Sequence, residues 1–180
     1  MLRTIRNILV KIRDYYLVSI KWRNFKFGKN FHAGRRVFLW AKNGIEIGDN
    51  CYIGRDSQIE TNVKFGNNIL IANNVAFVGK YDHNYHEVGT PIRLASEIRD
   101  KDYNWKGLNE ITIVEDDVWI GYGSIIISGV TIKTGSIIAA GSLVTKDVEE
   151  YSIYGGHPAK KLSDRFTEDE KIEHLRIING

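Results

Sequence analysis

The segment of the chain richest in groups that could do chemistry is residues 81–86, which read YDHNYH. It places the imidazoles of His83 and His86 three residues apart, with the carboxylate of Asp82 beside the first. Histidine exchanges protons near neutral pH, so either imidazole could serve as a general base that takes the proton of an attacking hydroxyl group. Clustered histidines can also bind zinc, but such a site needs at least three protein ligands, and this segment supplies two histidines.

The histidines interrupt a strict six-residue repeat. An apolar residue returns at every sixth position in two runs, one before and one after the histidine segment: Ile47, Ile53, Ile59, Phe65, Ile71 and Phe77, then Val114, Ile120, Ile126, Ile132, Ile138 and Val144. Small or apolar residues stand two positions earlier, and glycine, asparagine or aspartate follow. A short strand closed by a turn that tolerates left-handed backbone uses about six residues. The period therefore predicts a parallel β-helix whose stacked coils share one apolar column.

This pattern divides the chain into three parts. Residues 1–24 are predicted to form an amphipathic helix, and 25–162 the β-helix, with a loop inserted at about 79–110. Residues 163–180 are predicted to contain a second helix, because Thr167 and Glu170 have capping-box spacing. A loop this long inside a regular repeat is usually functional or disordered, since the coil does not need it.

Composition excludes several classes of protein. The chain has 180 residues, 43% hydrophobic and 26% charged, and a formal charge of +3, which suits a folded domain without a nucleic-acid-binding surface. The lone Cys51 excludes an intrachain disulfide, and no apolar run approaches the roughly 20 residues that span a bilayer. We therefore expect a cytoplasmic protein. The basic N-terminal helix carries an apolar stripe at helical spacing: Leu2, Ile5, Ile8, Leu9, Ile12, Tyr16 and Ile20. This stripe either packs over the open end of the coil or contacts the inner membrane surface.

The stretch 118–162 resembles the C-terminal signature of the hexapeptide-repeat acetyltransferases. Three motifs fall in that family's order and spacing: Trp119-Ile120-Gly121, Ala140-Gly141-Ser142, and GHPAK at 156–160. The segment VTKD at 144–147 matches as well. The resemblance is greatest to the sugar and polysaccharide O-acetyltransferases, including galactoside acetyltransferase. It implies a left-handed β-helix that forms a homotrimer, with active sites between subunits and acetyl-CoA bound as co-substrate between neighbouring coils.

The resemblance also implies roles for individual residues. The family's catalytic histidine follows a coil matching residues 71–75, which indicates His83 as the base, with His86 as the alternative. Contacts with acetyl-CoA are implied for Trp119, Tyr122, Ala140, Thr145, Lys146 and Lys160. Acceptor contacts are expected from Glu60, Tyr81, Asp82 and Tyr85, to which Trp105 could add a further aromatic surface. No metal is expected, and Cys51 is expected to pack inside the coil, so transfer would be direct.

The expected function is acetyl-CoA-dependent O-acetylation of a sugar or of a cell-surface polysaccharide precursor. One alternative is an N-acetyltransferase that acts on a nucleotide-linked amino sugar, because it would use the same fold, base and co-substrate. Another is a β-helix binding module without catalysis, which would release no thiol from acetyl-CoA. A γ-type carbonic anhydrase would require a third histidine, and ice binding would require regular threonine ladders.

Overall fold

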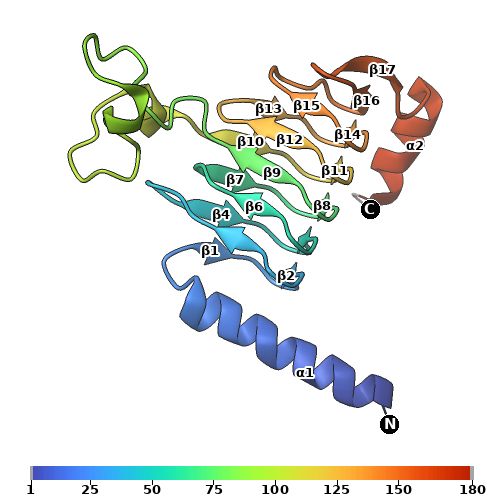
Figure 1. The fold of residues 1–180 in the computed structure, drawn as a ribbon. Coiled ribbons are helices and arrows are strands. Elements are labelled where there is room, and N and C mark those ends of the chain that lie inside the picture. Colours follow the sequence, from blue (N-terminus) through green and yellow to red (C-terminus); the bar gives the residue numbers. More distant parts are fainter. Residues whose placement is uncertain (1, 179–180) are drawn as a thin grey trace.

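The computed structural model describes residues 2–178, with side chains from Ile8 to Ile178. Short strands alternate with tight corners and stack into a solenoid whose three faces are three sheets (Figure 1). Sheet A consists of β1 (Lys26–Phe27), β4 (Ile45–Ile47), β7 (Val63–Phe65), β10 (Thr112–Val114) and β13 (Thr131–Ile132). Sheet B consists of β2 (His32–Ala33), β5 (Tyr52–Ile53), β8 (Leu70–Ile71), β11 (Trp119–Ile120), β14 (Ile137–Ile138), β16 (Ser152–Gly155) and β17 (Lys160–Asp164). Sheet C consists of β3 (Phe38–Leu39), β6 (Gln58–Ile59), β9 (Ala76–Val78), β12 (Ile125–Ile127) and β15 (Leu143–Val144).

Strand register confirms the six-residue period. Ile47 pairs with Phe65 and Ile53 pairs with Ile71, so one coil takes eighteen residues, or three repeats. Neighbouring strands in the coils are parallel, and among the strands of residues 2–178 only the last, β17, pairs antiparallel, with β16. The first coil is two residues longer, since Phe27 pairs with Ile47. The extra residues lie in the corner between β3 and β4.

The core is the predicted apolar column. Every residue of the two six-residue series is buried, and Ile53, Ile71, Val114, Ile120, Ile126, Ile132 and Ile138 have no exposed surface at all. The smaller residues two positions earlier complete the filling, and their hydroxyls are satisfied within the turns; for example, Ser124 Oγ donates to the Ala139 carbonyl at 3.1 Å. Each coil thus buries its inner face against its neighbours.

Corner residues adopt the left-handed backbone that the repeat requires. Asn30, Asn50 and Asn68 have φ values of 55°, 55° and 57°, a region that asparagine tolerates better than most residues. Their amides form a ladder between coils, with 2.9 Å from Asn30 Nδ2 to Asn50 Oδ1 and 3.1 Å from Asn50 Nδ2 to Asn68 Oδ1. At Gly54 a Cβ atom would overlap the backbone of Ala72 in the next coil, which explains the glycine there.

The N-terminal helix lies across the first coil, at one end of the solenoid (Figure 1). It consists of α1 (Leu2–Tyr16) and a π-helical turn, η1 (Leu17–Lys21). Leu17 and Val18 pack against the core, and Trp22 closes the end of the coil at 5% exposure. The expectation that the predicted apolar stripe covers this end was wrong for its described members, because Ile8, Leu9, Ile12, Tyr16 and Ile20 are all exposed. The side chains of Leu2 and Ile5 lie outside the described residues.

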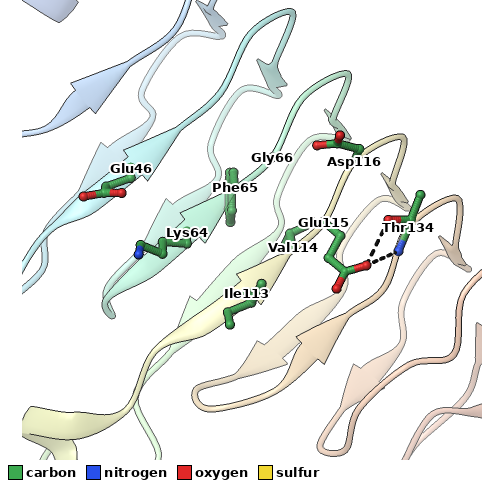
Figure 2. Close-up of a pocket in the computed structure, with 9 residues that line it drawn as sticks. All are labelled: Glu46, Lys64, Phe65, Gly66, Ile113, Val114, Glu115, Asp116 and Thr134. Atoms are coloured by element: carbon green, nitrogen blue, oxygen red, sulfur yellow. Dashed lines mark hydrogen bonds between the residues drawn. The ribbon is translucent and has the colours of Figure 1, made fainter. Parts of the chain in front are cut away.

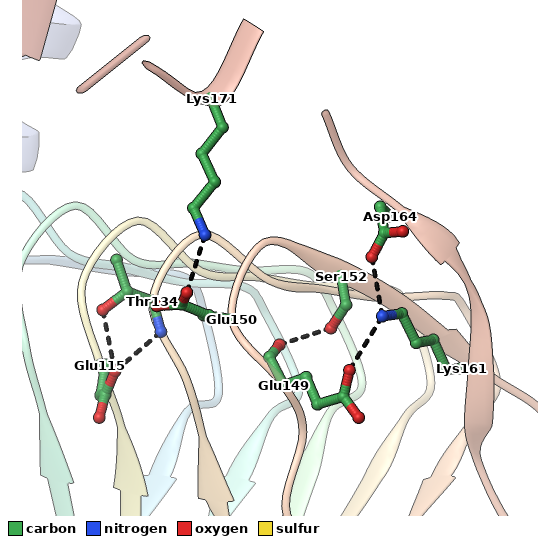
Figure 3. A network of polar contacts seen from close by, with 8 residues as sticks. All are labelled: Glu115, Thr134, Glu149, Glu150, Ser152, Lys161, Asp164 and Lys171. Atoms are coloured by element: carbon green, nitrogen blue, oxygen red, sulfur yellow. Dashed lines mark hydrogen bonds and ion pairs between the residues drawn. The ribbon is translucent and has the colours of Figure 1, made fainter. Parts of the chain in front are cut away.

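The other end of the solenoid is held by a polar network (Figure 3). Lys161 of β17 lies 2.9 Å from Glu149 and 2.8 Å from Asp164, and Lys171 of α2 (Glu168–Ile178) lies 2.7 Å from Glu150. The predicted capping box is confirmed, since the backbone N–H of Thr167 donates to Glu170 Oε2 at 2.9 Å and that of Glu170 donates to Thr167 Oγ1 at 3.3 Å.

Candidate active site

The candidate site lies where the inserted loop leaves the solenoid, at the corner that leads from sheet C to sheet A. Ile127 pairs with Val78, and the Glu60 N–H donates to the Phe77 carbonyl at 2.9 Å, so the ends of successive sheet C strands lie one above another. The register of Ile125 with Leu143 places Thr145 in the same stack. The loop begins here at Gly79 and returns at β10, as the break in the repeat predicted.

The loop is anchored to the coil and to itself. Buried Tyr103 donates its hydroxyl to the Tyr81 carbonyl and accepts the Gly107 N–H at 3.3 Å. Lys42 Nζ donates to the Asp100 carbonyl at 2.6 Å, and Asn43 Nδ2 donates to the Leu108 carbonyl at 2.6 Å. Both donors come from the lengthened corner of the first coil. Two short 3-10 turns, η2 (Ile92–Leu94) and η3 (Lys106–Asn109), complete the loop, which is therefore ordered.

A polar pocket of about 130 Å³ opens between this loop and the corner. It is lined by Trp40, Glu60, Asp82, His83, Glu97, Ile98 and Arg99. His83 and Glu97 face each other across an antiparallel bridge, with 3.7 Å between His83 Nε2 and Glu97 Oε2. The His83 side chain is 40% exposed, whereas its Nδ1 is buried and has no hydrogen-bond partner among residues 2–178. Nε2 is therefore the nitrogen that an acceptor could reach.

Opposite charges fill the rest of the pocket. Arg99 pairs with Glu60 at 2.8 Å, and its guanidinium stacks 4.5 Å from the centre of the Trp40 ring. Burial raises the pKa of the Asp82 carboxyl above its usual range, and the nearby Glu60 adds to the rise, while His83 and Arg99 oppose it. Any Cβ at Gly79 would overlap the Asp82 carboxylate, so glycine permits this close approach.

The raised pKa of Asp82 predicts a pH-dependent effect of Asp82→Asn on stability. A carboxyl with a higher pKa in the folded state favours folding below its unfolded pKa, and this contribution is lost as the pH rises through the folded value. An uncharged amide avoids that loss. We expect Asp82→Asn to unfold at a higher temperature than the parent at pH 7, with the gain fading below about pH 4. Thermal melts of the parent and the variant at pH 7 and below about pH 4 measure the difference in unfolding temperature. A gain of equal size under both conditions would contradict the raised pKa of Asp82.

The aromatic residues predicted for acceptor binding form a cluster in the loop. Tyr81 and Tyr85 both pack edge-on against Trp105, with ring centres 5.2 Å and 4.7 Å apart, and the His86 ring lies tilted against Tyr85 at 4.9 Å. The structure therefore brings these side chains together, but only Glu60, Asp82 and His83 of the predicted site residues line the polar pocket. His86 belongs to the aromatic cluster, which favours His83 as the base.

The residues predicted to contact the coenzyme fall in two places on one chain. Trp119 is 48% exposed on sheet B, and the Tyr122 carbonyl at the next corner accepts the Gly141 N–H at 2.7 Å, beside Ala140. Thr145 and Lys146 are exposed above the pocket corner, and Lys160 is exposed in β17. One chain thus brings Trp119, Tyr122 and Ala140 to one side and Thr145 and Lys146 to the side of His83.

Four pocket residues were missed by sequence reasoning: Trp40, Glu97, Ile98 and Arg99. Trp40 holds the position of Glu60 one coil earlier, since Phe38 pairs with Gln58, and it begins the corner that makes the first coil two residues longer. Glu97 and Arg99 reach the pocket only because the loop folds back, with the Ile98 N–H donating to the Asp82 carbonyl at 2.8 Å. No spacing in the sequence indicates that contact.

Cys51 is an unsuitable nucleophile. It is 1% exposed, and its thiol donates to the carbonyls of Asp49 and Gly66 at 3.4 Å and 3.3 Å. Burial raises the pKa of the thiol, which lowers the fraction of reactive thiolate. The expectation that Cys51 packs inside the coil is confirmed.

A second hollow, of about 440 Å³, lies on the outer face of sheet A (Figure 2). Glu46, Lys64 and Ile113 project into it, and Glu115 accepts the Thr134 N–H at its edge at 2.9 Å. None of the residues predicted to act in catalysis lines it. Among residues 2–178 no cluster of three histidine, cysteine or acidic side chains could hold a metal ion. Nor does any helix in that range have the length and hydrophobicity needed to cross a bilayer.

Six-residue repeats that form coils with three faces, interrupted once by an ordered loop that carries an imidazole, define a hexapeptide-repeat β-helix protein. The bacterial transferase hexapeptide family (six repeats) matches residues 111–146, and the hexapeptide repeat of succinyl-transferase matches residues 44–76. Galactoside O-acetyltransferase of Lactococcus lactis is 33% identical over 143 residues, which cover 72% of this chain and 69% of that protein. The chain belongs to the hexapeptide-repeat acetyltransferase family.

Other relatives match over shorter stretches. A probable macrolide acetyltransferase of Lysinibacillus sphaericus is 55% identical over 64 residues, or 36% of this chain. The chain spans only 28% to 35% of the length of the antibiotic acetyltransferases that it matches in this way. Among solved structures, galactoside acetyltransferase in complex with coenzyme A superimposes with a TM-score of 0.63 at 26% identity, covering 84% of this chain and 71% of that one.

Proposed function

We propose that the protein is an acetyl-CoA-dependent O-acetyltransferase that modifies a hydroxyl of a sugar or of a cell-surface polysaccharide precursor. The observation that carries the proposal is the half-exposed imidazole of His83 in a polar pocket at the corner that also presents Thr145 and Lys146. The relationship to galactoside O-acetyltransferase supports a sugar acceptor.

The reaction needs a single proton acceptor. As the acceptor oxygen attacks the thioester carbonyl, His83 Nε2 takes the hydroxyl proton. The C–O bond forms, the C–S bond breaks, and the imidazolium returns the proton to the departing thiolate of coenzyme A. No acyl-enzyme intermediate is involved, in keeping with the burial of Cys51. Glu97, 3.7 Å from Nε2, stabilises the positive charge that the imidazole carries between the two transfers.

Glu97→Gln tests that electrostatic contribution. Two unit charges about 4 Å apart near a protein surface interact by at least about 1 kcal/mol, so we expect kcat to fall about tenfold with little change in the KM for acetyl-CoA. Steady-state thiol release measures both constants. Glu46→Gln is a matched control, because the Glu46 side chain on sheet A is 43% exposed against 40% for Glu97. Equal rates for the parent and Glu97→Gln would remove Glu97 from this role.

The separation of the predicted coenzyme residues supports a homotrimer with active sites between subunits. A second copy packed beside sheet C would supply one wall of the acetyl-CoA groove, and the corner with Thr145 and Lys146 would supply the other. Lysine side chains suit the phosphates of the coenzyme. The exposed ring of Tyr85, packed against the partly buried ring of Trp105, suits the apolar face of a sugar ring. A cytoplasmic location remains a prediction.

A panel of acceptors tests the proposal. The protein is mixed with acetyl-CoA and, in separate reactions, with galactosides, oligosaccharides, a nucleotide-linked amino sugar or chloramphenicol, and thiol release is followed with the product identified by mass spectrometry. We expect release with a hydroxyl-bearing sugar. Release only with the amino sugar would indicate N-acetylation, release only with chloramphenicol would indicate an antibiotic acceptor, and no release with any compound would indicate a binding module.

A further inference from the structure

The N-terminal helix presents an apolar stripe that nothing in the described chain covers. The stripe consists of Ile8, Leu9, Ile12, Tyr16 and Ile20, which are 53%, 61%, 60%, 50% and 58% exposed. At about 100° per residue, the first four of these lie within an arc of about 100° on α1. A stripe of large apolar side chains left this open on an ordered helix indicates a binding surface.

The stripe faces away from the solenoid. The opposite side of the helix is the one that contacts the coil: Asp14 pairs with His32 at 2.6 Å, Arg13 donates to the Ala33 carbonyl, and Leu17 and Val18 pack on the core. Figure 1 shows α1 lying across the end of the solenoid rather than along its side. The stripe is therefore on the end surface of the molecule, where a flat partner can approach it.

Charge is strongly polarised along the chain. Residues 1–45, a range that includes the helix and the first coil, contain eleven lysines and arginines and a single acidic residue, Asp14, for a formal charge of +10. The remaining residues contain fourteen basic and twenty-one acidic side chains, for a formal charge of −7. The modest net charge of +3 hides this asymmetry. The end that carries the apolar stripe is thus the basic end of the protein.

We propose that this end docks on an anionic lipid bilayer, with the stripe inserted among the headgroups and the surrounding lysines and arginines on the lipid phosphates. A helix with an apolar arc and basic flanks lies in the plane of such an interface. It is held there both by burial of its apolar side chains and by electrostatic attraction to the anionic lipids. A second copy of the chain is a poorer partner for this surface, because end-to-end pairing would bring two basic ends together. The opposite, acidic part of the molecule faces away from the membrane.

Vesicle flotation tests the proposal. We expect the parent protein to float with vesicles of phosphatidylglycerol and phosphatidylethanolamine, to float less at high salt, and not to float with phosphatidylcholine alone. The double variant Leu9→Gln/Ile12→Gln should lose at least about tenfold in apparent affinity. The matched control is Ile172→Gln/Ile177→Gln on α2, where both side chains are 64% exposed at the other end of the solenoid. It should float like the parent, and circular dichroism checks that each variant is folded.

Two results would overturn the proposal. The first is that the parent protein does not bind anionic vesicles, and the Leu9→Gln/Ile12→Gln variant has a sedimentation coefficient different from that of the parent. That result would assign the stripe to contacts between copies. The second is a folded stripe variant that floats as well as the parent. Because flotation requires no acetyl transfer, these results are independent of whether the proposed activity is found.

Discussion

His83→Ala is expected to lower kcat for thiol release by about 10²–10⁴-fold, the usual contribution of a general base. Without the imidazole, the acceptor hydroxyl must attack the thioester while keeping its proton. The side chain is half-exposed and lies outside the core, so the variant should fold like the parent. Binding of acetyl-CoA, measured by calorimetry, should change by less than about twofold, because the predicted coenzyme contacts do not include His83.

His86→Ala is the control for that experiment. It removes the same group from the same loop, three residues away, where the imidazole packs against Tyr85 and Trp105 instead of lining the pocket. We expect a change in the acceptor KM at most. Full activity in His83→Ala together with loss of activity in His86→Ala would transfer the role of base to His86.

Ile126→Ala should destabilise the protein by about 2–5 kcal/mol, because it leaves a cavity in the shared apolar column. Ile126 has no exposed surface and contributes to a core in which every coil depends on the coils above and below it. Urea unfolding followed by circular dichroism, at one fixed protein concentration, measures the loss.

The neighbouring Ile125 provides a control of the same residue type. Its side chain points outward from the same strand and is 38% exposed, so Ile125→Ala should cost less than about 1 kcal/mol. Equal losses at the two positions would mean that the alternation of inward and outward side chains in β12 does not determine stability.

The coils could be predicted from the sequence because each repeat carries its own evidence. A residue such as Ile71 is apolar for the same physical reason as Ile53 and Ile120, so the signal accumulates over many turns, and all three have no exposed surface. The start of the loop was equally visible as a loss of phase after Phe77. The left-handed winding came from the family resemblance alone, since crossovers between parallel strands are normally right-handed.

The interior of the loop could not be predicted, because it has no repeat to fix its register. The pocket depends on Glu97 and Arg99 reaching back to His83 and Glu60, and these contacts follow from the whole path of the loop. Trp40 was overlooked because the first coil is two residues longer than the others, so the six-residue period does not align Trp40 with Glu60. The direction of the apolar stripe on α1 was misjudged for a related reason: periodicity defines a face of a helix but does not determine what that face meets.

The most direct test of the account is a crystal structure of the protein with coenzyme A bound. We predict that the coenzyme lies between two neighbouring copies and that its sulfur reaches the pocket at the corner of Glu60, Thr145 and the loop. An acceptor hydroxyl would then fit between that sulfur and His83 Nε2. Coenzyme bound with its sulfur in the hollow on sheet A, or on any face remote from His83, would contradict the account.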